Sequence, residues 1–298
     1  MATQSTVTPR DRLRRRLSTI SNLPSPPVVY TQISRVINDP DTSVKDVAAI
    51  MSEDAAMSAK VLRLSNTAFY GARNEITNIR QAVLLLGLEA VKSLVLSSSV
   101  FEMFKNHSND ADFQAGFWRH SLATALAGRV IVRNHPSLTG LDPEVAFSAG
   151  LLHDIGKLIV CCFMPEEHKG IMSQMSGGKM SMYQAEENTI GFSHTLVGQM
   201  LAENWKLPHA IQCGIEHHHF PRFDREEPEF YSVIVHIANY VAHKTLDGKL
   251  PQIEGWSYLL PEVTEALSLT DELTEQFCKL LFEAYSNSST FLQMAMAG

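Results

Sequence analysis

The sequence predicts an all-α protein, and three observations support this prediction. Apolar residues recur at spacings of three and four positions along most of the chain, as Val91, Leu94 and Val95 do. Helix-start signals precede several of these runs, for example Ser43 with Asp46 three residues later. We find no alternation of apolar and polar residues between turns, the pattern of half-buried strands. A chain of 298 residues that is 45% hydrophobic can bury a large core, in one big domain or two ordinary ones.

Residues 1–17 are predicted to form a flexible, basic N-terminal arm. The first nine residues are polar and rich in Ser and Thr, which favours disorder. An arginine-rich cluster follows, from Arg10 to Arg16. It either binds an acidic partner or forms the solvated face of a first helix, and we favour the helix. Its inward-facing residues would be Leu13, Leu17 and Ile20.

Residues 18–105 are predicted to form a helical N-terminal subdomain. The proline-rich stretch Leu23–Pro27 ends the first helix, because a residue before proline disfavours helical geometry. Helix starts are expected at Ser43 and at Asn78, and Gly87 is expected to end the second of these helices. The apolar residues at helical spacing are Val47, Ile50, Met51, Met57, Val61, Leu62, Leu64, Ile79, Val83, Leu84, Val91, Leu94, Val95 and Val100.

Residues 106–250 are predicted to form a second helical subdomain, after a polar break from Lys105 to Asp110. Residues 251–298 are predicted to add a C-terminal extension of two amphipathic helices. Loops are expected at Gly177-Gly178 and from Arg222 to Pro228. The first expected helix contains Phe113 and Phe117, and the second starts at Asp142-Pro143. Further helices are expected from Ser193-His194 to about Trp205, from Pro208 onward, and from about Glu229 to Thr245. The two helices of the C-terminal extension are expected to start near Pro261 and Thr270.

Composition and charge exclude several classes of protein. The net charge of −7 argues against non-specific binding to nucleic acid. The N-terminus lacks the apolar stretch of a signal peptide, and we expect no segment to approach the ~18 apolar residues of a membrane span. The four cysteines form no Cys-x-x-Cys pair, which indicates free thiols rather than disulfides. We therefore expect a cytoplasmic protein that has no membrane partner.

A histidine and a carboxylate lie side by side in the apolar stretch from Gly150 to Lys157. An ionised Asp154 in such surroundings is costly unless it is paired or binds a cation. The alternative is that it caps a helix or bonds to the backbone. Five histidines lie beside apolar residues at i±3 or i±4, on helices that could aim them at one interior point: His120, His153, His194, His218 and His219.

Each of these histidines alone fits a core residue held by a hydrogen bond, but five with an Asp predict a metal centre. Neutral imidazole suits zinc, iron, nickel and copper, and a shared carboxylate can bridge two ions. Two such ions can activate a nucleophile against a phosphoester. His217 could be a ligand in place of His218 or His219 if the helical register differs by one position. The histidines without this context, which we expect at the surface, are His107, His135, His168 and His209.

These residues carry a resemblance to a known family. The second half resembles the HD superfamily of metal-dependent phosphohydrolases, which it matches in order at His120, His153-Asp154-Ile155-Gly156-Lys157, His194, His218-His219 and Asn239. The whole chain is more similar to the HDOD family, in which an HD-like bundle follows a helical N-terminal subdomain. The segments that carry this similarity are Leu23–Pro27, Leu62–Tyr70, Ala82–Gly87, Trp205–Pro208 and His218–Pro221. The resemblance covers residues 18–245.

The resemblance implies which residues form the site. The metal ligands would be His120, His153, Asp154, His194, His218, His219 and Asn239, and the catalytic residues Asp154 and Lys157. Lys157 would face a substrate phosphate, unless it is a solvated lysine at a helix end. The last ligand is usually Asp, and Asn239 brings no charge and cannot act as a base. His236 and His243, on the same helical face as Asn239, could partly substitute for the missing charge.

HDOD proteins resemble bacterial signalling modules that lack demonstrated catalysis. The resemblance therefore implies a regulatory module that acts mainly through contacts with signalling proteins, and that holds one or two divalent ions of iron, zinc, manganese or nickel. The alternative is a metal-dependent phosphohydrolase that acts on a nucleotide or phosphoester. The Gly-Tyr-Pro motif of relatives that hydrolyse cyclic dinucleotides is absent after His219, so that activity is not expected. A third hypothesis, nucleic-acid binding, depends only on the cluster from Arg12 to Arg16.

Overall fold

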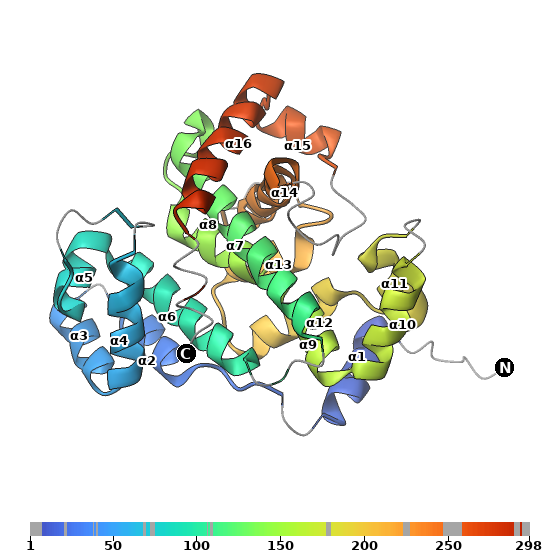
Figure 1. Cartoon of the computed structure of the whole chain (residues 1–298), viewed down its shortest axis with the longest axis horizontal. Helices are drawn as coiled ribbons and strands as arrows, with labels where there is room; N and C mark the ends of the chain where they lie inside the picture. Colours follow the sequence, from blue (N-terminus) through green and yellow to red (C-terminus); the bar gives the residue numbers. More distant parts are fainter. Residues whose placement is uncertain are drawn as a thin grey trace.

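The predicted all-α architecture is confirmed in the computed structural model of the chain (Figure 1). The structure describes residues 8–20, 23–37, 39, 41–67, 70–71, 75–105, 107, 110–176, 180–222, 227–246, 258–288 and 293. No strand occurs within these ranges, where one isolated bridge joins Thr139 and Leu141. Some expectations fall outside them: the disorder of residues 1–7, the Ala68-Phe69 pair of one family segment, the Gly177-Gly178 loop, and most of the loop from Arg222 to Pro228.

The N-terminal subdomain is a cluster of short helices on one side of the molecule (Figure 1). Its helices are α2 (Val28–Ile37), α3 (Val44–Ser52), α4 (Ala55–Ser65), α5 (Ile79–Leu86) and α6 (Leu88–Phe104). The predicted capping box at Ser43 is present, and the Asn78 side chain caps α5. Gly87 ends α5 and begins α6 with a φ of 93°, a conformation that favours glycine. The chain can therefore turn sharply between the two helices.

The second subdomain is built around the longest helix, α7 (Ala111–Asn134), and contains the 3-10 turn η1 (Pro136–Leu138). Helices α8 (Pro143–Leu152) and α14 (Glu227–Leu246) pack on α7, and α6 packs on α8 to join the two subdomains. Asp142 caps α8 and Pro143 is its first residue, as predicted. The remaining helices are α9 (Ile155–Phe163), α10 (Pro165–Met175), α11 (Met182–Thr189), α12 (His194–Asn204), α13 (His209–His217), α15 (Pro261–Ala266) and α16 (Asp271–Ser286).

The N-terminal arm differs from the flexible segment we expected, since its described part is an ordered helix, α1 (Pro9–Ser18). Leu13 is fully buried, as the favoured helical interpretation requires. Arg10 pairs with Glu203 on α12 at 2.5 Å, and Arg16 pairs with Glu167 on α10 at 2.6 Å. These contacts dock α1 on the second subdomain, next to α9 and α10 in Figure 1. The basic cluster is thus the outer face of a packed helix.

One expectation about apolar stretches is wrong. The segment Pro143–Phe163 is long and apolar enough to cross a membrane, but 94% of its most apolar 18-residue stretch is buried inside the protein. It consists of α8 and α9, and the His153-Asp154 pair lies between these two helices in the sequence. Its apolar character is explained by its position in the core of the helical bundle, where both faces of each helix pack on neighbours.

Candidate metal centre

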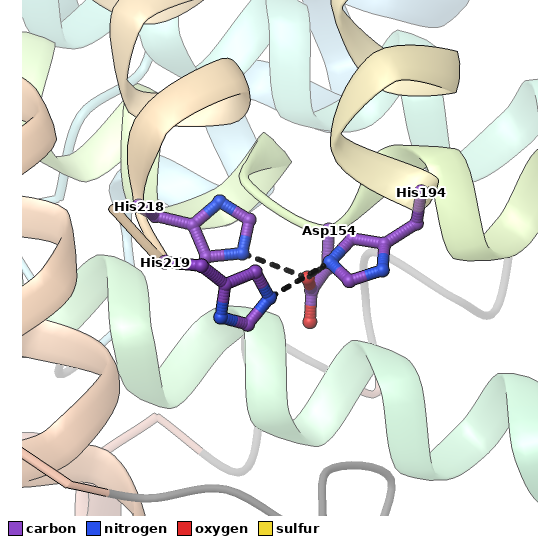
Figure 2. A group of neighbouring side chains, drawn as sticks. All are labelled: Asp154, His194, His218 and His219. Carbon is purple, nitrogen blue, oxygen red and sulfur yellow. Dashed lines mark hydrogen bonds and ion pairs between the residues drawn. The ribbon is translucent and has the colours of Figure 1, made fainter. Parts of the chain in front are cut away.

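The five predicted histidine ligands come from separate places in the fold and gather around Asp154, and Figure 2 shows three of them, His194, His218 and His219. Asp154 precedes the first residue of α9, and its side chain does not cap that helix. Its carboxylate therefore points into the interior, unlike the capping role considered as an alternative. His194 is the first residue of α12, and His218 follows the last residue of α13. Helix ends thus aim most of the ligands, while His120 projects from the middle of α7.

Asp154 belongs to two groups of potential ligands. The first group is His120, His153 and Asp154, and the second group is Asp154, His194, His218 and His219. Within each group the ligand atoms lie within 4.8 Å of one another. The two carboxylate oxygens divide between the groups, because Oδ2 faces the first group and Oδ1 the second. Asp154 is therefore placed to bridge two ions.

Three imidazoles are fixed so that their Nε2 atoms face Asp154. The Nδ1 atom of His153 donates to the Gly150 carbonyl at 2.7 Å, and that of His218 to the Ile215 carbonyl at 3.0 Å. The Nδ1 atom of His194 lies 2.6 Å from Oε2 of Glu186. Carbonyl and carboxylate oxygens only accept, so Nδ1 carries a proton in all three rings, and each ring that is neutral presents the lone pair of Nε2. Outer hydrogen bonds of this kind orient metal-binding histidines.

The donor set fits a divalent cation. The Nε2 atoms of His153, His194 and His218 lie 3.1, 3.3 and 3.4 Å from an oxygen of Asp154. Burial lowers the pKa of His218 to about 4, so its Nε2 presents a lone pair that repels the carboxylate unless a positive charge lies between them. Among the described residues, Asp154 Oδ1 and His218 Nε2 have no hydrogen-bond partner although both are buried. A cation bound by both atoms would satisfy them, and imidazole with carboxylate is a donor set that first-row transition metals accept.

Lys157 contributes a buried positive charge. It is fully buried rather than solvated, and its Nζ atom donates to Asp154 Oδ2 at 2.7 Å. Burial raises the pKa of Asp154, but the contacts with His153 and His194 and the charge of Lys157 outweigh burial and hold the pKa well below its usual range. The carboxylate is therefore ionised at neutral pH and available to a metal ion.

Helix α9, which begins directly after Asp154, and helix α12, which begins at His194, approach each other closely at Gly156. A Cβ atom added to Gly156 would lie 2.0 Å from the His194 carbonyl oxygen and 2.9 Å from the Gly198 nitrogen. Only glycine permits this backbone contact between α9 and α12. The close approach is what brings the first residue of α12 within reach of Asp154.

The structure also locates the residues around the expected last ligand. Asn239 is buried on α14. One turn later, the ring of His243 lies 4.7 Å from the ring of His120, so this face of α14 borders the first group. His236 cannot substitute as a ligand in this arrangement, because its Nδ1 donates to the His218 carbonyl and its Nε2 accepts from the Leu260 amide.

Sequence reasoning missed Glu186 and misplaced two histidines. Glu186 is fully buried on α11, and its Oε2 accepts from both the backbone amide and Nδ1 of His194. A glutamate eight residues before a histidine has no characteristic spacing, so only the fold reveals the pair. His135 and His168 are buried, not at the surface as we expected. His135 holds the Leu267 carbonyl and caps η1, while the ring of His168 packs on Phe113.

The described chain thus combines a helical fold with a buried histidine–aspartate centre. The sequence model of the HDOD domain family matches residues 23–221, and the chain belongs to this family. A solved HDOD domain protein of unknown function from Geobacter sulfurreducens is 25% identical, with a TM-score of 0.72 over 97% of this chain and 96% of that one. A protein from Shewanella amazonensis SB2B, provisionally described as a phosphohydrolase, is also 25% identical. Its TM-score is 0.68 over 93% of this chain and 97% of that one.

A third solved structure shows the fold alone. This protein from Marinobacter aquaeolei VT8, provisionally described as a signal transduction protein, is 19% identical with a TM-score of 0.75, over 96% of this chain and 65% of that one. Among curated proteins, an uncharacterized protein of Treponema pallidum (strain Nichols) is 23% identical over 78% of this chain and 44% of its own length. The chain thus spans less than half of that relative.

Proposed function

We propose that this protein is a bacterial signalling module that binds a divalent metal ion at Asp154 and acts mainly through contact with another signalling protein. The observation that carries the proposal is the second group, in which ligand atoms of Asp154, His194, His218 and His219 lie within 4.8 Å of one another. The provisional description of the Marinobacter protein as a signal transduction protein supports the signalling context. The four cysteines lie within the described residues and form no disulfide, which supports a cytoplasmic location.

The charges around Asp154 favour binding over catalysis. One carboxylate is shared by both groups, and the adjacent Lys157 already offsets its charge. Two divalent ions would add four positive charges to this buried site, which is unfavourable without further anions. We therefore infer that the second group holds one ion tightly and that the first group holds a second ion weakly. Asn239 cannot take a proton from an attacking nucleophile, as a carboxylate would.

The N-terminal subdomain supplies a surface that supports an output through protein contact. Leu84 and Leu85 on α5 are 67% and 59% exposed, although both are large and apolar. Adjacent exposed leucines are costly in water and favour a covered surface. Helix α5 lies at the outer edge of the molecule in Figure 1, far from α9 and α12.

The alternative is a metal-dependent phosphohydrolase that acts on a nucleotide or phosphoester. The provisional description of the Shewanella protein supports it. A bound divalent ion would supply Lewis-acid chemistry to a phosphoryl oxygen. Asp154 would position that ion, and Lys157 would place a positive charge near the phosphate.

Elemental analysis of protein purified without added ions tests the metal site. We expect about one iron, zinc, manganese or nickel ion per chain, and none after His153→Ala and His218→Ala are combined. His209→Ala, at an exposed histidine outside both groups, is the matched control. The loaded protein is then screened against nucleotides and a generic phosphodiester. Turnover that His153→Ala abolishes would establish the phosphohydrolase, whereas bound metal without turnover supports the signalling module.

A further inference from the structure

A cavity of about 520 Å³ lies between α1 and the outer faces of α9 and α12. This volume falls within the range of ~300–1,000 Å³ that is usual for ligand pockets. None of the candidate metal ligands lines it. Six apolar side chains form most of its described wall: Leu17, Leu23, Ile159, Val197, Met200 and Leu201.

Helix α1 closes one side of this cavity and is held there at its edges. The Arg10–Glu203 and Arg16–Glu167 pairs fix the helix at two points, and Arg12 donates to the Gly191 carbonyl at 3.2 Å. Contacts between polar groups thus keep the helix in place while apolar space remains beneath it. Apolar surface that faces water in such a space is unfavourable, and an apolar ligand would relieve it.

The mouth of the cavity carries a positive charge. Arg14 lines the cavity while its side chain is 66% exposed, so its guanidinium reaches the opening. Its contact with Asp11 is 3.8 Å, longer than a hydrogen bond, and such surface pairs contribute little. The other charged residue of the lining, Glu203, is already paired with Arg10. The charge available to a ligand at this opening is therefore positive.

We propose that the cavity binds a free, single-chain anionic amphiphile, a carboxylate with an unbranched alkyl tail. The tail occupies the apolar wall formed by α1, α9 and α12, and the carboxylate lies at Arg14. This site is separate from the metal centre. Ile159 and Val197 in its wall belong to the helices that start next to Asp154 and at His194.

Calorimetric titration with monomeric alkyl carboxylates tests the site. Each methylene that enters the cavity contributes about fourfold in affinity, so octanoate, decanoate and dodecanoate should bind about fifteenfold more tightly at each step until the cavity is full. Decyltrimethylammonium, with a similar tail and the opposite charge, should bind at least fivefold more weakly than decanoate. Saturation at one decanoate per chain is the expected stoichiometry.

Three variants separate the cavity from general charge effects. Met200→Trp fills the cavity and should abolish decanoate binding. Arg14→Glu should weaken it at least fivefold, whereas Arg15→Glu, with the same charge change at an exposed residue outside the lining, should leave it unchanged. Metal content and thermal unfolding of each variant check that the fold is intact. If Met200→Trp does not fold, the Arg14 and Arg15 variants and the chain-length series decide the question.

Several results would overturn the proposal. They are the absence of saturable decanoate binding by the unmodified protein, equal binding of the cationic amphiphile, and equal loss in the Arg14→Glu and Arg15→Glu variants. Binding to anionic phosphatidylglycerol vesicles without binding of monomeric decanoate would also overturn it, and would assign this surface to a membrane instead.

Discussion

The two ligand groups that share Asp154 differ in how firmly their members are held. In the second group, His194 is fixed by the buried Glu186 carboxylate and His218 by the Ile215 carbonyl. In the first group, His153 is fixed by the Gly150 carbonyl, but His120 Nε2 lies 3.7 Å from Asp154 Oδ2. The neighbouring position on α14 is the uncharged Asn239. The second group is thus more complete as a metal site than the first.

Under the proposed function, this difference separates metal binding from catalysis. The second group would hold one ion beside the pair His153-Asp154. The uncharged Asn239, on a separate helix, would leave a second ion without one of its anions. Stability and metal binding can therefore persist while the charge that supports catalysis is lost.

Removing Asp154 should have the largest effect, because it belongs to both groups. Asp154→Ala should abolish metal binding and lower the free energy of unfolding of the metal-free protein by about 3–5 kcal/mol, since it takes the carboxylate away from the buried Lys157. The double variant Asp154→Ala/Lys157→Met should recover most of this stability but no metal. Urea unfolding and elemental analysis measure both effects. Equal stability of the single and double variants would contradict the pairing.

Single ligand variants should separate the two groups. His194→Ala should remove the tightly bound ion, because it takes away a fixed imidazole of the second group. His120→Ala should retain that ion with nearly the affinity of the unmodified protein, because His120 belongs only to the first group and faces the other oxygen of Asp154. Competition with a chelator measures the affinities. Loss of the tight ion in both variants would show that the two groups act as one site.

Glu186→Gln tests whether the outer carboxylate supports the second group. The amide keeps the shape of the side chain but removes the charge that faces His194 Nδ1 at 2.6 Å. Such outer partners typically change metal affinity by about 10–100-fold, and we expect a loss in this range with an unchanged fold. Glu187→Gln, the adjacent exposed residue, is the matched control. A loss of less than threefold would mean that Glu186 only packs.

Asn239→Asp should restore part of the first group. The added carboxylate should raise the affinity for a second ion by about tenfold or more, since ligand charge tunes such sites. Elemental analysis at increasing metal concentration should then show two ions per chain where the unmodified protein shows one. Asn239→Leu should leave the tight ion in place. If Asn239→Asp leaves the stoichiometry at one, the missing charge is not what limits the first group.

The sequence predicted the local elements well because their signals are local. The capping residues Ser43, Asn78 and Asp142 each act within three residues of their own position, and the structure confirms all three. Five histidines and Asp154 were predicted to converge, since they are polar groups in apolar surroundings. The structure brings all of them together.

What the sequence could not show depends on contacts between distant segments. Glu186 lies on a helix that we did not predict, and its role depends on where α11 packs against α12. The arginines of α1 were expected on the solvated face of a helix, whereas Arg10 and Arg16 pair with Glu203 and Glu167, more than 150 residues away. Pairs so distant leave no pattern in a single sequence.

The two histidines His194 and His218 also predict how metal binding depends on pH. Burial lowers the pKa of His194, but the Glu186 carboxylate outweighs burial and raises it to about 9. Burial lowers the pKa of His218 to about 4. His194 therefore carries a proton at pH 7 that a metal ion must displace, whereas His218 is already neutral. Affinity should rise by roughly tenfold per pH unit from pH 6 and level off near pH 9, with about one proton released per ion at pH 7. Calorimetry in two buffers with different ionisation enthalpies counts that proton. In Glu186→Gln the pKa of His194 falls, so the proton count should drop towards zero. An unchanged count in that variant would assign the proton to another group.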